Sequence, residues 1–238
     1  MQHLFTCFAA GLLLSAAPAA AQTTFRLGVR GGAHQAQMTM AGSRTASPHQ
    51  VDKGEVYTWQ TGIVLEASTG NFALQPALLF SQKGFGFDAV DAVVGVAGTD
   101  TWRSAGSDRY NWLELPLNVV YTWHGDYGLQ LFAGPYVALA VGGQQRGTST
   151  FNSWTGAIYT NSIDRKLADS SVSNSQRLDA GVNFGIGYRQ GPLQVQLGYG
   201  LGLRNLYELA QRISPESSSP SATYNRVVHL TGTYFFAL

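Results

Sequence analysis

The sequence predicts an all-β protein: an eight-stranded antiparallel up-and-down transmembrane β-barrel with long extracellular loops and short periplasmic turns. Three observations predict this fold class. Apolar residues recur at every second position through most of the chain, which is the period of a β-strand. Several of these segments are longer than the roughly five or six residues that are usual for strands of soluble proteins. The connections between the segments alternate between short and long.

Composition excludes several other classes of protein. Charged residues make up 12% of the 238 residues, whereas soluble domains usually carry about 25%. Low charge combined with 12% aromatic residues argues against intrinsic disorder. The formal net charge of +1 argues against a nucleic-acid partner, because nucleic-acid-binding proteins normally show a basic face.

Residues 1–21 have the pattern of a secretory signal peptide, because an apolar run is followed by an A-x-A ending before Gln22. This run is shorter than the roughly 20 residues that a membrane-spanning helix needs. We therefore expect one barrel domain over residues 22–238. The single cysteine, Cys7, lies in the signal segment, so the mature domain has no thiol for a disulfide, a metal site or a nucleophile.

Eight segments carry the period-two alternation. It is clearest in residues 178–189 and 193–204, where large apolar residues alternate with Gly, Gln, Asn and charged residues. Frequent glycines inside the segments, and the lack of a stripe with a period of 3.6 residues, argue against helices. The expected strands cover residues 25–35, 56–68, 71–84, 109–123, 127–145, 175–190, 192–206 and 224–237.

Three of the connections are tight turns that contain glycine, at residues 69–71, 124–126 and 190–192. In outer-membrane barrels the short turns are periplasmic and the longer loops are extracellular. Eight strands would place both chain ends on the short-turn side, so the long connections are expected to face outside. These polar connections cover residues 36–55, 86–108, 146–174 and 207–223.

The two faces of the expected strands differ in chemistry. In a membrane barrel the apolar face meets lipid and the polar face lines the lumen. The polar face consists mainly of Gly, Gln and Asn with occasional charges, which suits a cramped interior. Aromatic residues gather near the strand ends, where membrane barrels have their interfacial girdles. The expected girdle comprises Tyr57, Trp59, Tyr110, Trp112, Tyr121, Trp123, Tyr127, Tyr188, Tyr234, Phe235 and Phe236.

Charged residues on the polar face form the candidate site. The interior of an eight-stranded barrel is just wide enough to be filled by side chains, so charges there must pair. One interpretation is a salt-bridge network that plugs and rigidifies the barrel. A ligand-binding lumen, a path for small solutes and a proton relay are the alternatives. The candidate residues are Arg26, Arg30, Glu66, Glu114, Arg177, Asp179, Arg189 and Arg204.

The sequence lacks the common catalytic and metal-binding motifs. The histidines show neither H-E-x-x-H nor H-x-H spacing, and there is no G-x-S-x-G, P-loop or dinucleotide fingerprint. We therefore expect no enzymatic activity, no cofactor and no metal. A lipid hydrolase that pairs His34 or His229 with a Ser or Thr is a remote alternative.

Several short motifs resemble those of the PorT-like outer-membrane β-barrel proteins of Bacteroidetes-type bacteria. Residues 110–117, YNWLELPL, are similar to the family's Y-x-x-(L/I)-E-(I/L)-P-(L/I) strand, and residues 134–136, GPY, to its G-x-Y strand. A D-x-G to G-x-G element over residues 179–188 and a G-L-x-N ending at Asn205 extend the similarity over most of the mature chain. The resemblance implies an outer-membrane barrel and admits a role in protein secretion.

These features favour a structural or interaction protein of the outer membrane, with a mostly plugged lumen and contacts made by its outer loops. The alternatives are a transport barrel for small solutes or apolar ligands and a component of envelope protein secretion. We expect a monomer in the outer membrane of a Gram-negative bacterium after export. The expected partners are outer-membrane lipid, lipopolysaccharide and, during biogenesis, the barrel-assembly machinery, with no nucleic acid.

Overall fold

The computed structural model describes residues 23–41, 50–166, 177–206 and 222–237. The signal peptide expected at residues 1–21 lies outside these described residues. Within them, no helix has the length and hydropathy needed to cross a membrane. The strands are β1 (Thr24–Ala41), β2 (Gln50–Gly54), β3 (Val56–Thr69), β4 (Phe72–Val94), β5 (Thr99–His124), β6 (Tyr127–Asn152), β7 (Ile158–Lys166), β8 (Leu178–Gln190), β9 (Leu193–Gly202) and β10 (Ala222–Ala237).

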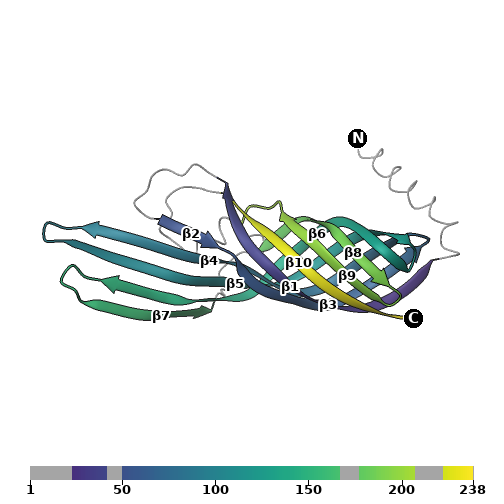
Figure 1. The fold of residues 1–238 in the computed structure, drawn as a ribbon, viewed down its shortest axis with the longest axis horizontal. Helices are drawn as coiled ribbons and strands as arrows, with labels where there is room; N and C mark the ends of the chain where they lie inside the picture. The colour runs from purple at the N-terminus through teal and green to yellow at the C-terminus, as the bar shows by residue number, and fades with distance from the viewer. Residues whose placement is uncertain (1–22, 42–49, 167–176, 207–221, 238) are drawn as a thin grey trace.

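Eight of these strands close into a barrel (Figure 1). Around the barrel the order is β1, β3, β4, β5, β6, β8, β9 and β10, and β10 pairs again with β1. Every pairing is antiparallel, and closure leaves no unpaired strand edge to face lipid. The predicted fold class, an all-β up-and-down barrel of eight strands, is therefore confirmed.

Both described ends of the barrel chain lie at the end that carries the short turns (Figure 1). Arg26, near the start of β1, pairs with Ala237 of β10 and with Glu66 of β3. The three predicted turns connect β3 to β4, β5 to β6 and β8 to β9. Each turn contains a glycine with a φ between 54° and 66°, a left-handed conformation that glycine adopts without a steric penalty.

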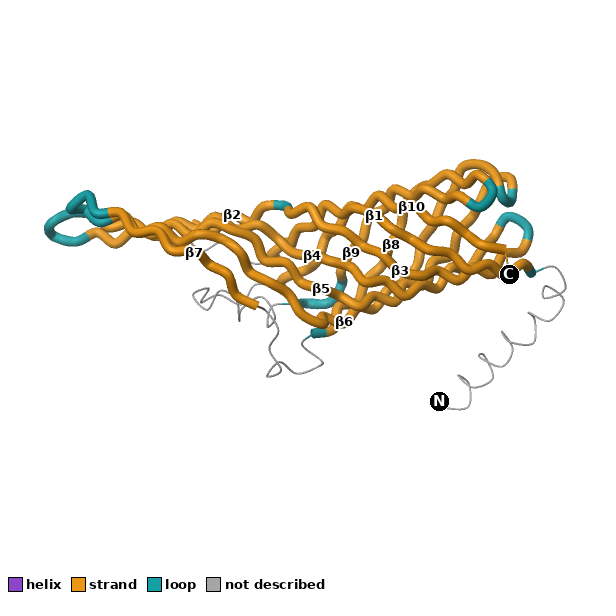
Figure 2. The backbone as a smooth tube through the Cα atoms, turned by 90° about the horizontal axis from the view of Figure 1, so that it is seen from below, coloured by secondary structure: helices purple, strands orange, loops and turns teal. Residues whose placement is uncertain are grey.

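The outer parts of β4, β5 and β6 leave the barrel and continue as an open sheet (Figures 1 and 2). β2 pairs with β4, and β7 pairs with β6, which gives the sheet the order β2-β4-β5-β6-β7. The prediction of loops at residues 86–108 and 146–174 is therefore wrong for most of their described residues. The alternation breaks down there because both faces of the sheet are outside lipid, while Val, Thr, Trp, Phe and Tyr still favour strands.

The apolar residues of the barrel strands face outward. They form an exposed band around the barrel, as expected for a surface that meets lipid rather than water. At the short-turn end the band is bordered by exposed aromatic side chains of Phe25, Phe72, Trp123, Tyr127 and Tyr188. The band includes Val29, Ile63, Leu65, Leu74, Leu78, Leu113, Leu115, Leu117, Val119, Leu131, Val137, Phe184, Ile186, Val195, Leu197, Val228 and Leu230.

Three of the aromatic residues assigned to the girdle lie elsewhere. Tyr110, Trp112 and Phe235 are buried inside the barrel, with at most 2% of their surface exposed. Tyr110 and Trp112 share the inward face of β5 with Glu114, because residues two apart along a strand point to the same side. Their position near strand ends is typical of a girdle, but they belong to the alternate residues that point inward, so they lie in the lumen.

We predict that Leu197→Arg destabilises the membrane-inserted barrel by roughly 2–4 kcal/mol, because it places a charge near the middle of the lipid-facing band. Leu197 lies in the middle of β9 and is 49% exposed. Leu203→Arg is the control, because Leu203 is 60% exposed but lies beyond the outer end of β9. Urea unfolding in lipid vesicles measures both variants. Equal losses would contradict the assignment of the outward face to lipid.

Candidate functional site

The lumen is filled by the inward-facing side chains of all eight barrel strands. Three levels can be distinguished along it: an ionic cluster at the short-turn end, a small cavity in the middle and an apolar cluster at the outer end. Each level draws residues from strands that are far apart in the sequence, because the barrel brings every inward face to one axis.

The ionic cluster is centred on Glu66, whose side chain is fully buried. Arg189 donates to Glu66 Oε2 at 2.6 Å, and Arg26 donates to Glu66 Oε1 at 3.0 Å. Arg26 also forms a two-pronged contact with Asp126, at 2.9 and 2.7 Å, and Arg189 Nε lies 3.7 Å from the same carboxylate. The guanidinium of Arg189 lies 4.8 Å from the centre of the Phe235 ring. Two arginines and two carboxylates thus neutralise one another across the barrel.

A layer of amide side chains extends the ionic cluster. Gln75 donates to Glu66 Oε2 at 2.8 Å and to Gln194 Oε1 at 3.0 Å. Buried Arg30 donates from Nε to Thr233 at 2.9 Å and from Nη2 to Gln75 at 3.3 Å. Arg30 therefore belongs to the same network, although its side-chain hydrogen bonds are to the neutral groups Thr233 and Gln75. This layer of hydrogen bonds connects side chains from several strands across the lumen at the short-turn end.

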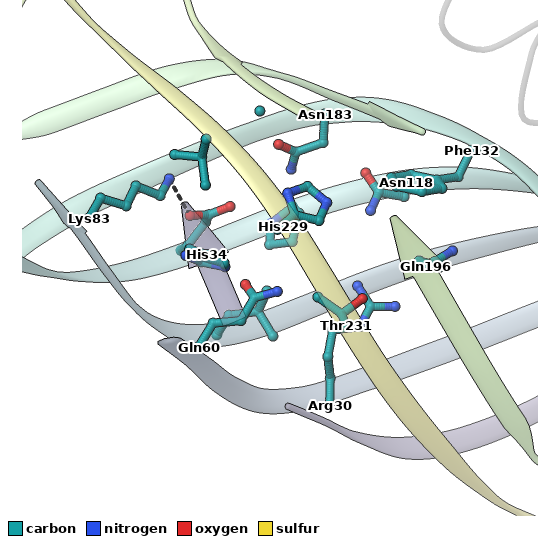
Figure 3. A pocket seen from close by; sticks show the side chains of 15 residues that line it. Arg30, His34, Gln60, Lys83, Asn118, Phe132, Asn183, Gln196, His229 and Thr231 are labelled. Atoms are coloured by element: carbon teal, nitrogen blue, oxygen red, sulfur yellow. Dashed lines mark ion pairs between the residues drawn. The ribbon is translucent and has the colours of Figure 1, made fainter. Parts of the chain in front are cut away.

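The middle of the lumen contains a small cavity beside a buried ion pair (Figure 3). Lys83 Nζ lies 2.6 Å from Glu114 Oε2, and both side chains are almost completely buried. His34 and His229 face each other across the β1–β10 pairing with 6.1 Å between their ring centres. The cavity between these side chains is small, about 20 Å³.

Gly198 of β9 makes room for the imidazole of His229. A Cβ atom at this position would lie 2.2 Å from His229 Nε2 and 2.6 Å from the Phe132 ring. Both distances are shorter than any van der Waals contact, so a larger residue would displace the ring. This explains one glycine of the glycine-rich inward face of β9: it accommodates a facing side chain.

The outer level combines a buried carboxylate with an apolar cluster. Asp179 Oδ2 accepts hydrogen bonds from the Tyr136 hydroxyl at 3.1 Å and from Asn225 Nδ2 at 2.8 Å. Lys83 Nζ lies 4.5 Å from the centre of the Tyr136 ring, which links this level to the middle one. The apolar cluster fills the outer mouth of the barrel. It consists of Met38, Phe85, Tyr110, Trp112, Tyr136, Ala138, Ala140 and Leu206, with Phe87 packed against it.

The candidate residues fall into separate groups. Arg26, Arg30, Glu66 and Arg189 meet in the layer at the short-turn end, whereas Glu114 pairs with Lys83 in the middle and Asp179 lies at the outer level. Two candidates lie outside these groups. Arg177 precedes β8 and Arg204 follows β9, so both lie at the outer end of the barrel, remote from Glu66.

Several members of the network were absent from the candidate set. Four of these residues carry no charge, so charge on the polar face does not identify them, although each lies on the inward face of its strand. They are Gln75, Tyr136, Gln194 and Asn225. Asp126 belongs to the turn between β5 and β6, where the alternation gives no face. The sequence indicates the inward position of these four neutral residues only through the alternation of each strand, because every second residue faces the lumen.

The described residues offer little for catalysis or metal binding. They contain no group of three or more His, Cys, Asp or Glu side chains that could hold a metal ion. His34 Nδ1 lies 3.3 Å from the backbone oxygen of Gln82, so this ring nitrogen is engaged by the main chain. The His229 ring lies 6.2 Å from the Phe132 ring between centres, tilted by 36°.

A closed antiparallel barrel with an apolar outer band and a polar, filled interior is the architecture of an outer-membrane protein. In agreement with it, the model of the family described as outer membrane protein beta-barrel domain matches residues 20–208. The chain belongs to this family. The match spans most of the barrel, including every residue of the ionic cluster.

Known structures show distant similarity to this family member. Ail, the attachment invasion locus protein of Yersinia pestis, is 11% identical, with a TM-score of 0.42; 90% of this chain and 99% of that chain are covered. The neisserial surface protein NspA is 9% identical, with a TM-score of 0.40 and coverage of 88% and 97%. TodX, a monoaromatic hydrocarbon channel, is 9% identical in a deletion mutant, with a TM-score of 0.27 and coverage of 90% and 91%. No curated protein matches the chain.

Proposed function

We propose that this protein is a plugged outer-membrane barrel that anchors a rigid extracellular sheet for contacts outside the cell. The observation that carries the proposal is the contrast between its two halves. Side chains fill both ends of the lumen around a small cavity of about 20 Å³, whereas the sheet β2-β4-β5-β6-β7 extends well beyond the barrel (Figure 2). The barrel then acts as the anchor and the sheet as the working surface.

The filled lumen also argues against catalysis, because a substrate would have to displace buried ion pairs to reach a histidine. We therefore propose a non-enzymatic protein that is exported by the segment at residues 1–21. The YNWLELPL strand supports a place among PorT-like proteins, and with it a second candidate role in envelope protein secretion. Such a role is compatible with a closed lumen if the sheet binds secretion partners.

Transport is the main competing function, and electrical recording separates the two. The mature chain in a planar lipid bilayer should show no sustained conductance above the protein-free baseline, because the Glu66 layer and the Trp112 cluster block both ends of the lumen. Folding is checked independently by heat-modifiable gel mobility. Steady ion flux through folded protein would contradict the plugged barrel and favour a small-solute channel.

The role of the sheet needs a separate measurement. A shortened variant in which residues 88–105 are replaced by Gly-Gly should keep its heat-modifiable mobility, because the barrel closes below this segment. Cells that display the full chain should then attach to one another or to surfaces more than cells that display the shortened chain. Equal attachment would contradict the interaction role and leave the plugged barrel untouched.

A further inference from the structure

Three basic side chains cluster on the outward face of the sheet, where it leaves the barrel. Arg109 of β5 and Lys166 of β7 both pair with Gln144 of β6, and Arg146 lies two residues further along β6. All three side chains are exposed. The strand spacing and register place the Cα atoms of Arg146 about 7–8 Å from those of Arg109 and Lys166. The Cα atoms of Arg109 and Lys166 are roughly 10 Å apart.

This basic cluster lies just beyond the outer limit of the apolar band, where long side chains can reach back to the lipid headgroups. Arg109 shares the outward face of β5 with Leu113, which pairs with Leu139 and Phe80 near the outer limit of the apolar band. Arg109 and Leu113 are four positions apart, which is about 13 Å along the strand and about 10 Å along the membrane normal at a 40° tilt. The headgroup layer on each side of the hydrocarbon core is roughly 5–8 Å thick. The long side chains of Arg109 and Lys166 can extend back into it.

The cluster carries an excess of positive charge. Among the described residues the carboxylate beside it is Asp164, which pairs with Arg146 in register and accepts a hydrogen bond from Gln144 at 2.6 Å. None of the salt bridges among the described residues involves Arg109, Arg146 or Lys166. On the other side of Arg109, its partner in β4 is Gly84, so no side chain from that strand occupies the space beside the guanidinium. Counting these four described residues, Arg109, Arg146, Lys166 and Asp164, the surface has a net charge of +2.

We propose that Arg109, Arg146 and Lys166 bind the phosphate of a lipid headgroup in the outer leaflet, as carried by the lipid A part of lipopolysaccharide. Guanidinium groups bind phosphate through two parallel hydrogen bonds, and an ammonium adds a compact charge. The site is independent of the lumen and of any partner of the sheet. It would fix the sheet relative to the membrane surface at the point where the strands emerge.

The test compares two double variants in the mature protein, reconstituted in phosphatidylcholine nanodiscs and titrated with lipid A. Arg109→Gln/Arg146→Gln removes two charges from the proposed site. Arg103→Gln/Arg165→Gln removes the same charge from the same sheet, but Arg103 lies further out and Arg165 faces the other side. We expect roughly thirtyfold weaker binding in the first variant, since each basic residue near an anionic surface contributes a factor of about five. We expect less than a threefold change in the second.

Two further arms identify the source of the phosphate. Dephosphorylated lipid A should bind as weakly to the unchanged protein as lipid A binds to Arg109→Gln/Arg146→Gln. Inorganic phosphate, at the same concentration as lipid A, should not displace it. Equal losses in the two double variants, or tight binding of dephosphorylated lipid A, would overturn the site. Displacement by inorganic phosphate would overturn the assignment to a lipid.

Discussion

Glu66→Ala is expected to lower the free energy of unfolding by about 3–5 kcal/mol, because removing one partner of a buried charge pair leaves the other charge uncompensated. Arg189 has only 2% of its side chain exposed and would lose its contact at 2.6 Å, keeping Asp126 at 3.7 Å. Gln75 would lose an acceptor as well. Urea unfolding in lipid vesicles measures the loss.

A matched control for Glu66→Ala is Asp88→Ala in the outer sheet. Asp88 accepts two hydrogen bonds from Arg103, at 2.9 and 2.6 Å, which lower the pKa of its carboxyl group, but both side chains are exposed. Exposed ion pairs contribute little, so Asp88→Ala should have a far smaller effect than Glu66→Ala. The double variant Glu66→Leu/Arg189→Met should lose less than the sum of its two single changes, because the charges disappear together. Equal effects of Glu66→Ala and Asp88→Ala would contradict the buried network.

Trp112→Ala is expected to destabilise the barrel by a similar amount, about 3–5 kcal/mol, because it empties the centre of the apolar cluster at the outer mouth. Trp112 is completely buried and lies 6.4 Å from Tyr110 between ring centres. The control is Trp123→Ala on the same strand, whose side chain is 63% exposed and points toward lipid at the short-turn end. Vesicle unfolding should show a clearly smaller loss for Trp123→Ala. A larger loss there would contradict the inward position of Trp112.

Much of the fold could be predicted because the alternation of apolar and polar residues shows which side chains of a strand share a face. The alternation in residues 178–189 and 193–204 defines both faces of β8 and β9 without any knowledge of their partners. The outer sheet could not be predicted in this way. Where both faces of a strand are outside lipid, the alternation disappears, so residues 86–108 had the composition of a loop although they pair along nearly their whole length.

The candidate site was only partly accessible for a different reason. Parity places Glu66, Arg26 and Arg189 on inward faces, but which of them meet depends on the stagger between strands around the closed barrel. That stagger brings Asp126, from a turn, to Arg26, and keeps Glu114 with Lys83 instead of with Arg189. Arg177 shares the parity of Asp179, yet it precedes β8 at the outer end of the barrel, where its backbone oxygen accepts a hydrogen bond from Ala140 N at 2.9 Å. Residues that all face the lumen can therefore lie far apart along the barrel axis and make no contact with one another.

The outer sheet is continuous with the barrel wall, and this has a mechanical consequence. β5 and β6 each run for 26 residues, or about 85 Å when extended, from the barrel into the sheet, with register shifts between Asn111 and Trp112 and between Thr122 and His124. A pulling force on the tip, directed along the strands, loads the long β5–β6 ladder lengthwise, so that many hydrogen bonds must shear together. A hinged loop under the same force would first straighten and then open its attachment one bond at a time. The continuous strands therefore allow the protein to resist a pulling force between the membrane and a partner bound at the tip of the sheet.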